Sequence, residues 1–334
     1  MSSGGGASSS SSSTQKGKAS LAELRVDDLG TVKEIFSVSG EAPVVDAMNI
    51  LFAKNVLSIP VENENKEFYA FIDLLDIVTF MVHLFDETAL GTHNRWQEEL
   101  QHLAVLEQGE RFTTTKVKEI AGLSERNPFI PVKQGEPLLQ VLEILGKKRV
   151  HRVPIVNEEG KVVNIVTQSA VVDHLAKHMS ALGPIVNTPL KELGVVGKKK
   201  VITVSIDSRT IDAYKLMHQH KISAIAVVDA DGHLVANVST RDIRAISTDS
   251  SILAKLYQPI SHFLTQIHMD SIDIVNPAIS CSMKDALGLV LGKLAVSKVH
   301  RIYIVDAQNQ PIDVISLSDI LVLLSSTAAP SSQK

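Results

Sequence analysis

Residues 300–306 read His-Arg-Ile-Tyr-Ile-Val-Asp, and residues 316–320 read Ser-Leu-Ser-Asp-Ile. The run Ile302–Val305 is rich in β-branched and aromatic side chains, which is typical of a strand. A polar turn and a second apolar run connect the two stretches, and an aspartate then stands at the start of a helical pattern. The segment therefore predicts strand, turn, strand and helix in this order.

The same arrangement occurs four times along the chain. Comparable apolar strands are found at Ile59–Val61, Val153–Val156, Ile225–Val228 and Ile302–Val305. Sixteen residues beyond Pro60, Pro154, Ala226 and Tyr303, which hold equivalent places in these strands, come Asp76, Ala170, Asp242 and Asp319. Apolar residues spaced four apart, such as Ala47 and Leu51, precede each strand and share one helix face. A constant spacing in four segments indicates an internal repeat.

Each repeat is a mixed α/β unit of helix, strand, turn, strand and helix. A unit of about 60 residues does not bury both faces of a small sheet by itself. Pairing two units sheet against sheet would bury that surface, so four units predict two pairs. The expected segments are a disordered Ser/Gly tail at 1–19, units at 30–90, 116–180, 190–250 and 265–326, a helical connector at 91–115 and a loose C-terminus at 327–334.

Composition narrows the possible classes of protein. The 334 residues are 44% hydrophobic with a net charge of -4, which gives no reason to expect nucleic acid or a membrane as partner. Cys281 is the single cysteine, so we expect a reducing compartment, the cytoplasm and also the nucleus. We find no Walker loop, nucleophile elbow or GxGxxG motif, which argues against an enzyme.

Three of the four residues at the end of the constant spacing are aspartates. A carboxylate at a helix N-terminus can cap free backbone N–H groups, which is a purely structural role. Its two acceptor oxygens also suit the paired hydroxyls of a ribose. Recurrence beside hydroxyl residues favours the binding role, and an arginine near the strand would suit a phosphate.

These motifs resemble those of the cystathionine-β-synthase (CBS) family, in which two modules form a Bateman domain. The stretch His151-Arg152-Val153-Pro154 and the two stretches quoted first are similar to the gamma subunits of AMP-activated protein kinase. The resemblance implies four CBS modules paired into two Bateman domains that form a flat, pseudo-symmetric disc. It also implies a non-catalytic regulatory subunit that binds AMP, ADP or ATP and assembles with kinase alpha and beta subunits.

The resemblance also assigns nucleotide contacts to residues of this chain. The most complete expected pocket comprises Ser223, His300, Arg301, Ser316, Ser318 and Asp319. A second comprises His151, Arg152, Ser239, Thr240 and Asp242. Ile130 is expected to line an adenine slot, and Asp76 marks a third, weaker pocket. The resemblance implies no metal and no cofactor.

Several residues depart from the gamma pattern. They are Leu57, Asp73, Leu75 and Ser169. Ala170 is not a departure, because the gamma pattern also lacks an aspartate in the second module, and the resemblance implies one empty pocket there. Leu57 and Ser169 replace basic residues, and Asp73 adds a negative charge beside Asp76. A second interpretation is therefore a CBS scaffold, or a regulator of another enzyme, whose nucleotide response is weak or lost.

Three sets of basic residues are expected to lie at the surface or to bind no metal. Lys198–Lys200 is predicted to form an exposed loop before a strand. The basic run Lys147–His151 is predicted to be a solvated helix C-terminus, with phosphate attraction or a pseudosubstrate-like role, which the gamma resemblance suggests, as the alternative. His218 and His220 have no carboxylate nearby at metal-ligand spacing, so no metal site is predicted there.

Overall fold

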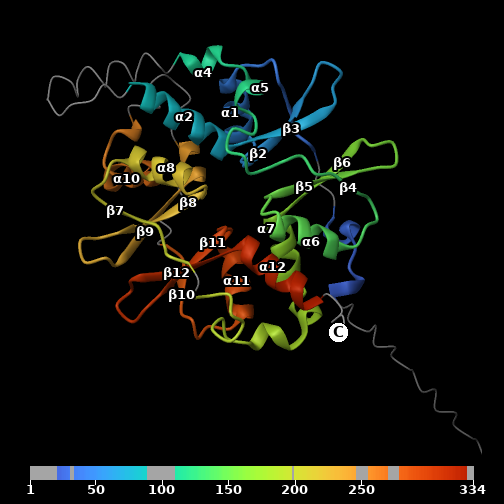
Figure 1. The fold of residues 1–334 in the computed structure, drawn as a ribbon, viewed down its shortest axis with the longest axis vertical. Helices are drawn as coiled ribbons and strands as arrows, with labels where there is room; N and C mark the ends of the chain where they lie inside the picture. The colour runs from blue at the N-terminus through green and yellow to red at the C-terminus, as the bar shows by residue number, and fades with distance from the viewer. Residues whose placement is uncertain are drawn as a thin grey trace, which may run out of the picture.

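The computed structural model describes residues 21–30, 34–88, 110–197, 199–245, 255–269 and 278–328. The predicted tail at 1–19, most of the connector at 91–115 and most of the C-terminus at 327–334 lie outside the described residues. Figure 1 shows four small modules around a common centre, in the circular order one (blue), two (green), four (red) and three (yellow).

The helices and strands follow the predicted repeat. Module one contains β1 (Val38–Ser39), α1 (Val44–Ala53), β2 (Ser58–Glu62), β3 (Phe68–Asp73) and α2 (Leu74–Thr88). Module two contains β4 (Val132–Lys133), α6 (Leu138–Lys147), β5 (Arg152–Val156), β6 (Val162–Thr167) and α7 (Gln168–Lys177). Module three contains β7 (Thr203–Ser205), α8 (Thr210–Gln219), β8 (Ala224–Val228), β9 (Leu234–Ser239) and the 3-10 helix η4 (Thr240–Ala245). Module four contains β10 (Ser280–Cys281), α11 (Leu287–Ser297), β11 (Arg301–Val305), β12 (Pro311–Ser316) and α12 (Leu317–Ala328).

Short helices lie before and between the modules. They are η1 (Leu21–Glu23), η2 (Val26–Leu29), α4 (Arg111–Thr114), α5 (Val117–Ile120), η3 (Met179–Asn187) and α10 (Ile260–Met269). Module three differs from the others because its described residues after β9 form a 3-10 helix rather than an α-helix. Such i→i+3 turns are frequent where a helix begins.

All four sheets share one topology. Each has three strands, the first parallel to the second and the second antiparallel to the third. The register places Arg152 opposite Thr167 and Arg301 opposite Ser316. The first residue of the central strand therefore lies beside the N-terminus of the helix that follows the sheet. This register brings side chains from two separate segments to one end of each module.

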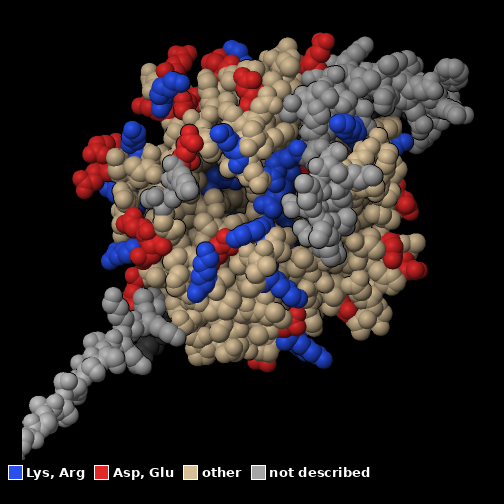
Figure 2. Space-filling view, turned by 180° about the vertical axis from the view of Figure 1, so that it is seen from behind, with Lys and Arg blue, Asp and Glu red and all other residues tan. Residues whose placement is uncertain are grey.

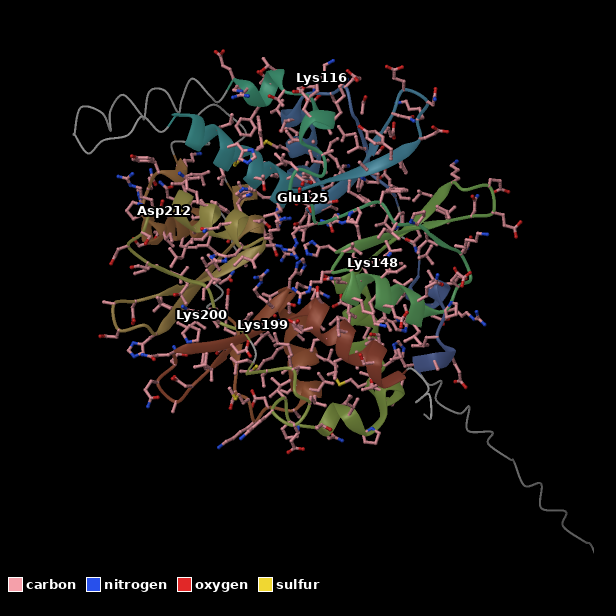
Figure 3. The ribbon with its side chains drawn as sticks, viewed as in Figure 1. Lys116, Glu125, Lys148, Lys199, Lys200 and Asp212 are labelled. Atoms are coloured by element: carbon pink, nitrogen blue, oxygen red, sulfur yellow. The ribbon has the colours of Figure 1, made fainter. Side chains whose placement is uncertain are left out.

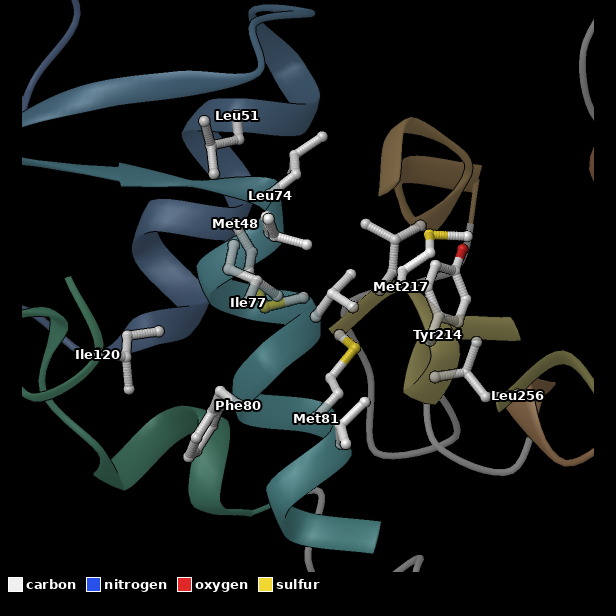
Figure 4. Close-up of a cluster of buried hydrophobic side chains, with 14 of the residues drawn as sticks. Met48, Leu51, Leu74, Ile77, Phe80, Met81, Ile120, Tyr214, Met217 and Leu256 are labelled. Carbon is white, nitrogen blue, oxygen red and sulfur yellow. The ribbon is translucent and has the colours of Figure 1, made fainter. Parts of the chain in front are cut away.

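Helix packing joins module one to module three and module two to module four. One hydrophobic core contains α2 and α8, and Figure 4 shows Met81 facing Met217 and Tyr214 across that boundary. A second core contains the helices of modules two and four, where α6 packs on α12. The helices approach closely at Gly146, where a Cβ atom would lie 2.9 Å from the backbone N of Val322.

Sheet packing joins the other neighbours. In modules one and two, the rings of Phe71 and Phe129 have centroids 5.5 Å apart, and the Arg152 guanidinium lies over Phe71. In modules three and four, Tyr303 donates a 2.6 Å hydrogen bond to Asn237. The prediction of four modules in sheet-to-sheet tandem pairs is confirmed.

The segment before each module reaches across to another module of the same pair. Backbone bridges join Arg25 to Pro137, Lys116 to Pro43, Pro189 to Ala286 and Pro259 to Arg209. Leu21 and Val26 are buried in the core of modules two and four, although they precede module one in the chain. The two members of a pair are therefore linked by exchanged segments as well as by their sheets.

None of the helices in the described ranges combines the length and the apolar character needed to span a bilayer.

Candidate functional site

A cavity of about 760 Å³ lies where the four modules meet, and residues of all four line it. The space-filling view shows a hollow near the middle of one face, with lysine and arginine side chains around it (Figure 2). Side-chain nitrogen atoms also gather between the modules in Figure 3. The cavity is large enough for a ligand of nucleotide size.

Lys298 and the carboxylates of Glu34, Asp73 and Asp242 are among the residues that line the cavity. Four arginines supply most of its positive charge. They are Arg152 from module two, Arg241 and Arg244 from module three, and Arg301 from module four. Arg301 donates to the Ala224 carbonyl and to Ser223 Oγ, each at 2.7 Å. The Nε atoms of Arg152 and Arg301 are buried, and each is without a hydrogen-bond partner among the described residues. A buried donor of this kind is costly unless an acceptor reaches it, so both atoms favour an anionic ligand.

The two predicted histidines lie among these arginines. Burial, with repulsion from neighbouring arginines, lowers the pKa of His300 to about 3. Burial and the charges of Arg126 and Arg152 likewise lower the pKa of His151 well below its ordinary value. Both rings are therefore neutral at pH 7, and each has one N–H to donate. The arginines stay charged, since even the pKa of Arg152 and that of Arg244, lowered by burial to about 10, leave them protonated.

The three aspartates of the repeat share one local contact. Each carboxylate accepts the backbone N–H of the residue three positions earlier, from Asp73, Ser239 and Ser316 at 2.9, 2.7 and 2.8 Å respectively. This is one contact of a capping box, in which the third helical residue accepts the backbone N–H of the N-cap residue, and it gives each aspartate a structural role. The aspartates differ in what contacts the rest of each carboxylate.

Asp242 lies at the cavity wall. Ser239, Thr240 and Arg241 line the cavity beside it. Burial raises the pKa of the Asp242 carboxyl, although hydrogen bonds from Ser239 and the charges of Arg241 and Arg244 act in the opposite direction. An acceptor pair surrounded by cationic donors can hold a hydroxyl and a phosphate at neighbouring positions.

Asp76 lies outside the cavity lining. It is 1% exposed, and its second oxygen accepts the Ser124 N–H at 2.8 Å. Asp73 beside it accepts backbone N–H groups of Leu75 and Asp76 and the side-chain amide of Asn127. The carboxylates of Asp73 and Asp76 thus both accept hydrogen bonds from groups of the protein itself. Asn127 in turn accepts the His151 N–H at 2.8 Å, which ties this pair to module two.

Asp319 also lies outside the cavity lining. Its Oδ2 atom accepts a hydrogen bond from Ser316 Oγ at 2.6 Å and forms an ion pair with Lys199 Nζ at 2.5 Å. Lys199 was predicted to lie in an exposed loop, and that prediction is wrong for this side chain, which is only 34% exposed. The segment is held inward because the Gly197 N–H donates to the buried carboxylate of Asp313.

Module two has no aspartate at this position. Thr167 Oγ1 accepts the Ala170 N–H at 3.1 Å and caps the helix instead. The Nε2 atom of Gln168, with two N–H groups to donate, lies 2.9 to 3.0 Å from the Leu145 and Val150 carbonyls and from Ser318 Oγ. Ser169 Oγ lies 3.1 Å from His300 Nε2. The hydroxyls of Ser318 and Ser169 therefore connect modules two and four.

The structure brings most of the predicted residues together but regroups them. The cavity is lined by Asp242, Ser239, Thr240, His151, Arg152, Ser223, His300 and Arg301. The last three were expected around Asp319. Asp319, Ser316, Ser318, Ile130 and Asp76 lie outside the lining. The nucleotide-binding role of each residue stays a prediction.

Sequence reasoning missed Arg244 and Lys199. Arg244 follows Arg241 by three residues, and this spacing places both side chains on one side of a helical turn. Its guanidinium donates to the Asn55 side chain and so links modules three and one. The helical spacing could have revealed Arg244, whereas no local pattern marks Lys199.

One group of described side chains could supply three metal ligands within 4.8 Å of one another, namely Asp229, Asp231 and His233. It lies in the polar turn between β8 and β9. There, Asp229 already accepts the backbone N–H groups of Asp231 and His233.

The repeats match a known family. The profile of the CBS domain matches residues 26–83, 117–177 and 190–249, which is more than half of the chain. The chain belongs to the CBS-domain family. The fourth CBS module is evident from the structure, since β10–β12 repeat the topology of the other three sheets.

The similar proteins include one that is named as a kinase regulatory subunit and others whose names state no role. An Arabidopsis thaliana protein, SNF1-related protein kinase regulatory subunit gamma-1-like, is 31% identical over 233 residues, covering 65% of this chain and 51% of that protein. Protein SDS23 of Kluyveromyces lactis is 29% identical over 323 residues, covering 87% of this chain and 60% of that protein. This CBS protein thus spans about half to three-fifths of the length of these relatives.

Solved structures support the arrangement of the modules. A Methanocaldococcus jannaschii protein, described as a candidate archaeal homologue of g-AMPK, superposes with a TM-score of 0.68 at 18% identity, covering 90% of this chain and 99% of that one. A conserved protein of Pyrococcus horikoshii superposes with a TM-score of 0.53 at 15% identity, covering 90% and 100%. Both show that the four-module fold recurs.

Proposed function

We propose that this CBS protein binds an adenine nucleotide in the central cavity, with the phosphates among the four arginines and the ribose at Asp242. The main support is the pair of buried Nε donors on Arg152 and Arg301, which have no partner among the described residues and which the phosphates of a nucleotide would satisfy. The neutral His151 and His300 add donors without adding further charge repulsion.

We further propose that the nucleotide regulates a protein kinase of the AMP-activated type, with this chain as its gamma-like subunit. The similarity to the Arabidopsis gamma-1-like protein supports this role. A ligand in the cavity would contact both sheet-to-sheet pairs, because the arginines come from modules two, three and four. Exchange of AMP, ADP and ATP would then change how the two pairs pack on each other.

Titration calorimetry of the full chain with AMP and with ATP tests the binding proposal. We expect binding tighter than millimolar, weakened about tenfold or more by Arg241→Gln, since a charge-assisted hydrogen bond contributes roughly 1.5–3 kcal/mol. The matched control is Lys161→Gln, at an exposed lysine in the turn between β5 and β6 that does not line the cavity. Unchanged affinity in Arg241→Gln, with thermal melting that shows a folded protein, would contradict this site.

The similarity to SDS23, whose name does not mark it as a kinase subunit, is equally compatible with a second candidate, a CBS regulator of a different enzyme. Affinity purification of the tagged chain separates the two. Recovery of kinase alpha and beta subunits supports the gamma-like role, while a stable complex that lacks them supports the second candidate.

A further inference from the structure

One oxygen of the Asp319 carboxylate already receives three donors from the protein. Its Oδ2 atom receives the Ser316 N–H at 2.8 Å, the Ser316 hydroxyl at 2.6 Å and the Lys199 ammonium at 2.5 Å. Burial acts to raise the pKa of Asp319, but the hydrogen bonds from Lys199 and Ser316 outweigh it and hold that pKa below its ordinary value. The carboxylate is therefore charged and paired at neutral pH.

Lys199 is held at this position by more than the ion pair. Its Nζ atom also lies 3.5 Å from the Val314 carbonyl, and the nearby Gly197 N–H is bound to Asp313. The side chains of Lys199 and Asp319 are only 34% and 17% exposed, so solvent screens the pair less than an ordinary surface ion pair. At Oδ2 a ribose hydroxyl would be a neutral donor competing against a charged one, so the carboxylate does not offer both of its oxygens to the paired hydroxyls of a ribose.

Asp242 provides the contrast. It has the same place in the repeat and the same capping contact, here from Ser239. The cations beside Asp242 are Arg241 and Arg244, and all three residues line the cavity. The two guanidinium groups beside Asp242 donate to the Lys298 carbonyl and to Asn55, and within the described part of the chain they form no ion pair with the carboxylate. At Asp319 the cation is bound directly to the carboxylate.

We propose that Lys199 is an internal occupant of the Asp319 position, which closes it to ligands, so that the protein binds a single nucleotide at Asp242. Lys199 would then determine the number of nucleotides bound per chain. The inference rests on the proposed function, because it takes adenine nucleotides as the ligands.

Calorimetry of the full chain with AMP, and separately with ATP, measures this number directly. We expect one nucleotide per chain for the wild type and two for Lys199→Met, which keeps the length of the side chain and removes its charge. Lys200→Met is the matched control, because Lys200 is adjacent and exposed (Figure 3), and it should bind one. Adding Asp319→Asn to Lys199→Met should return the number to one.

Each outcome separates the two proposals. One nucleotide per chain in both the wild type and Lys199→Met overturns the role of Lys199 and leaves the central site intact. Two nucleotides per chain in the wild type would likewise overturn the role of Lys199 and leave the central site intact. No binding by the wild type but one nucleotide in Lys199→Met supports the role of Lys199 and contradicts the central site. No binding by either protein overturns both proposals.

Discussion

Asp76 and Asp73 form a buried acidic pair in module one. Burial, together with repulsion from Asp73, raises the pKa of Asp76 to about 7, despite two backbone N–H groups that favour the charged form. In an unfolded chain the same carboxyl has an ordinary pKa near 4. The folded protein therefore binds an extra proton between these two values, and this carboxyl costs stability as the pH rises through them.

We predict that Asp76→Asn changes the pH dependence of stability in a defined direction. The free energy of unfolding of the wild type, relative to that of the variant, should fall by about 3 kcal/mol between pH 5 and pH 8. Urea denaturation at several pH values measures it. His151 and His300 have lowered pKa values, which make stability rise with pH. Because both proteins contain these histidines, their contributions cancel in the difference between the wild type and the variant. A difference that does not vary with pH would show that Asp76 is charged throughout this range.

At the level of single residues, the sequence predicted where the three aspartates lie in the repeat better than it predicted which groups contact them. The constant spacing located Asp76, Asp242 and Asp319 at the start of a helical segment, as the structure has them. Their contrasting surroundings depend on segments far away in the chain. Ser124 is 48 residues from Asp76, and Lys199 is 120 residues from Asp319. A repeat pattern contains no information on such contacts.

Among the helices, α6 and α12 depend on close backbone approach. At Gly146 an added methyl group would meet the Val322 backbone, which has no flexible end to move aside. Gly292 in α11 is also helical, but a Cβ atom there meets nothing within 4 Å. The two glycines therefore differ in packing while sharing the same helix propensity.

We predict opposite effects of alanine at these two positions. Gly146→Ala should destabilise the protein by about 1–3 kcal/mol, because the helices must separate. Gly292→Ala should be neutral, or stabilising by up to about 1 kcal/mol, since alanine is the better helix former. Chemical denaturation of both variants gives the comparison. Equal effects would show that α6 and α12 can adjust without cost.

At the scale of the whole molecule, each module has two different partners. Its sheet packs on one neighbour, and its helices pack on another. The sequence predicted the sheet-to-sheet pairs, because an open small sheet must be covered. It did not predict that α2 meets α8, since both helices have apolar faces that could pack on any similar surface. The common cavity follows from that second set of contacts.

We predict that a destabilising substitution in one module also destabilises the module whose helices pack on it. Met217 in module three is fully buried against α2 of module one (Figure 4), and Met217→Ala should cost about 2–5 kcal/mol. Hydrogen exchange followed by mass spectrometry should show faster exchange in α2 as well as in α8. Faster exchange confined to module three would mean that the helical interface does not couple the modules.

The exchanged segments have a consequence for how the protein is made. Residues 21–29 pack on module two through the bridge at Pro137, so they have no docking surface until more than 100 further residues have left the ribosome. Val117 and its neighbours, by contrast, find module one already synthesised. Helix α2 must wait longer still, for α8, with its apolar face uncovered. Nascent chains therefore expose hydrophobic surface at least until α8 has been synthesised, which is the condition under which chaperones bind.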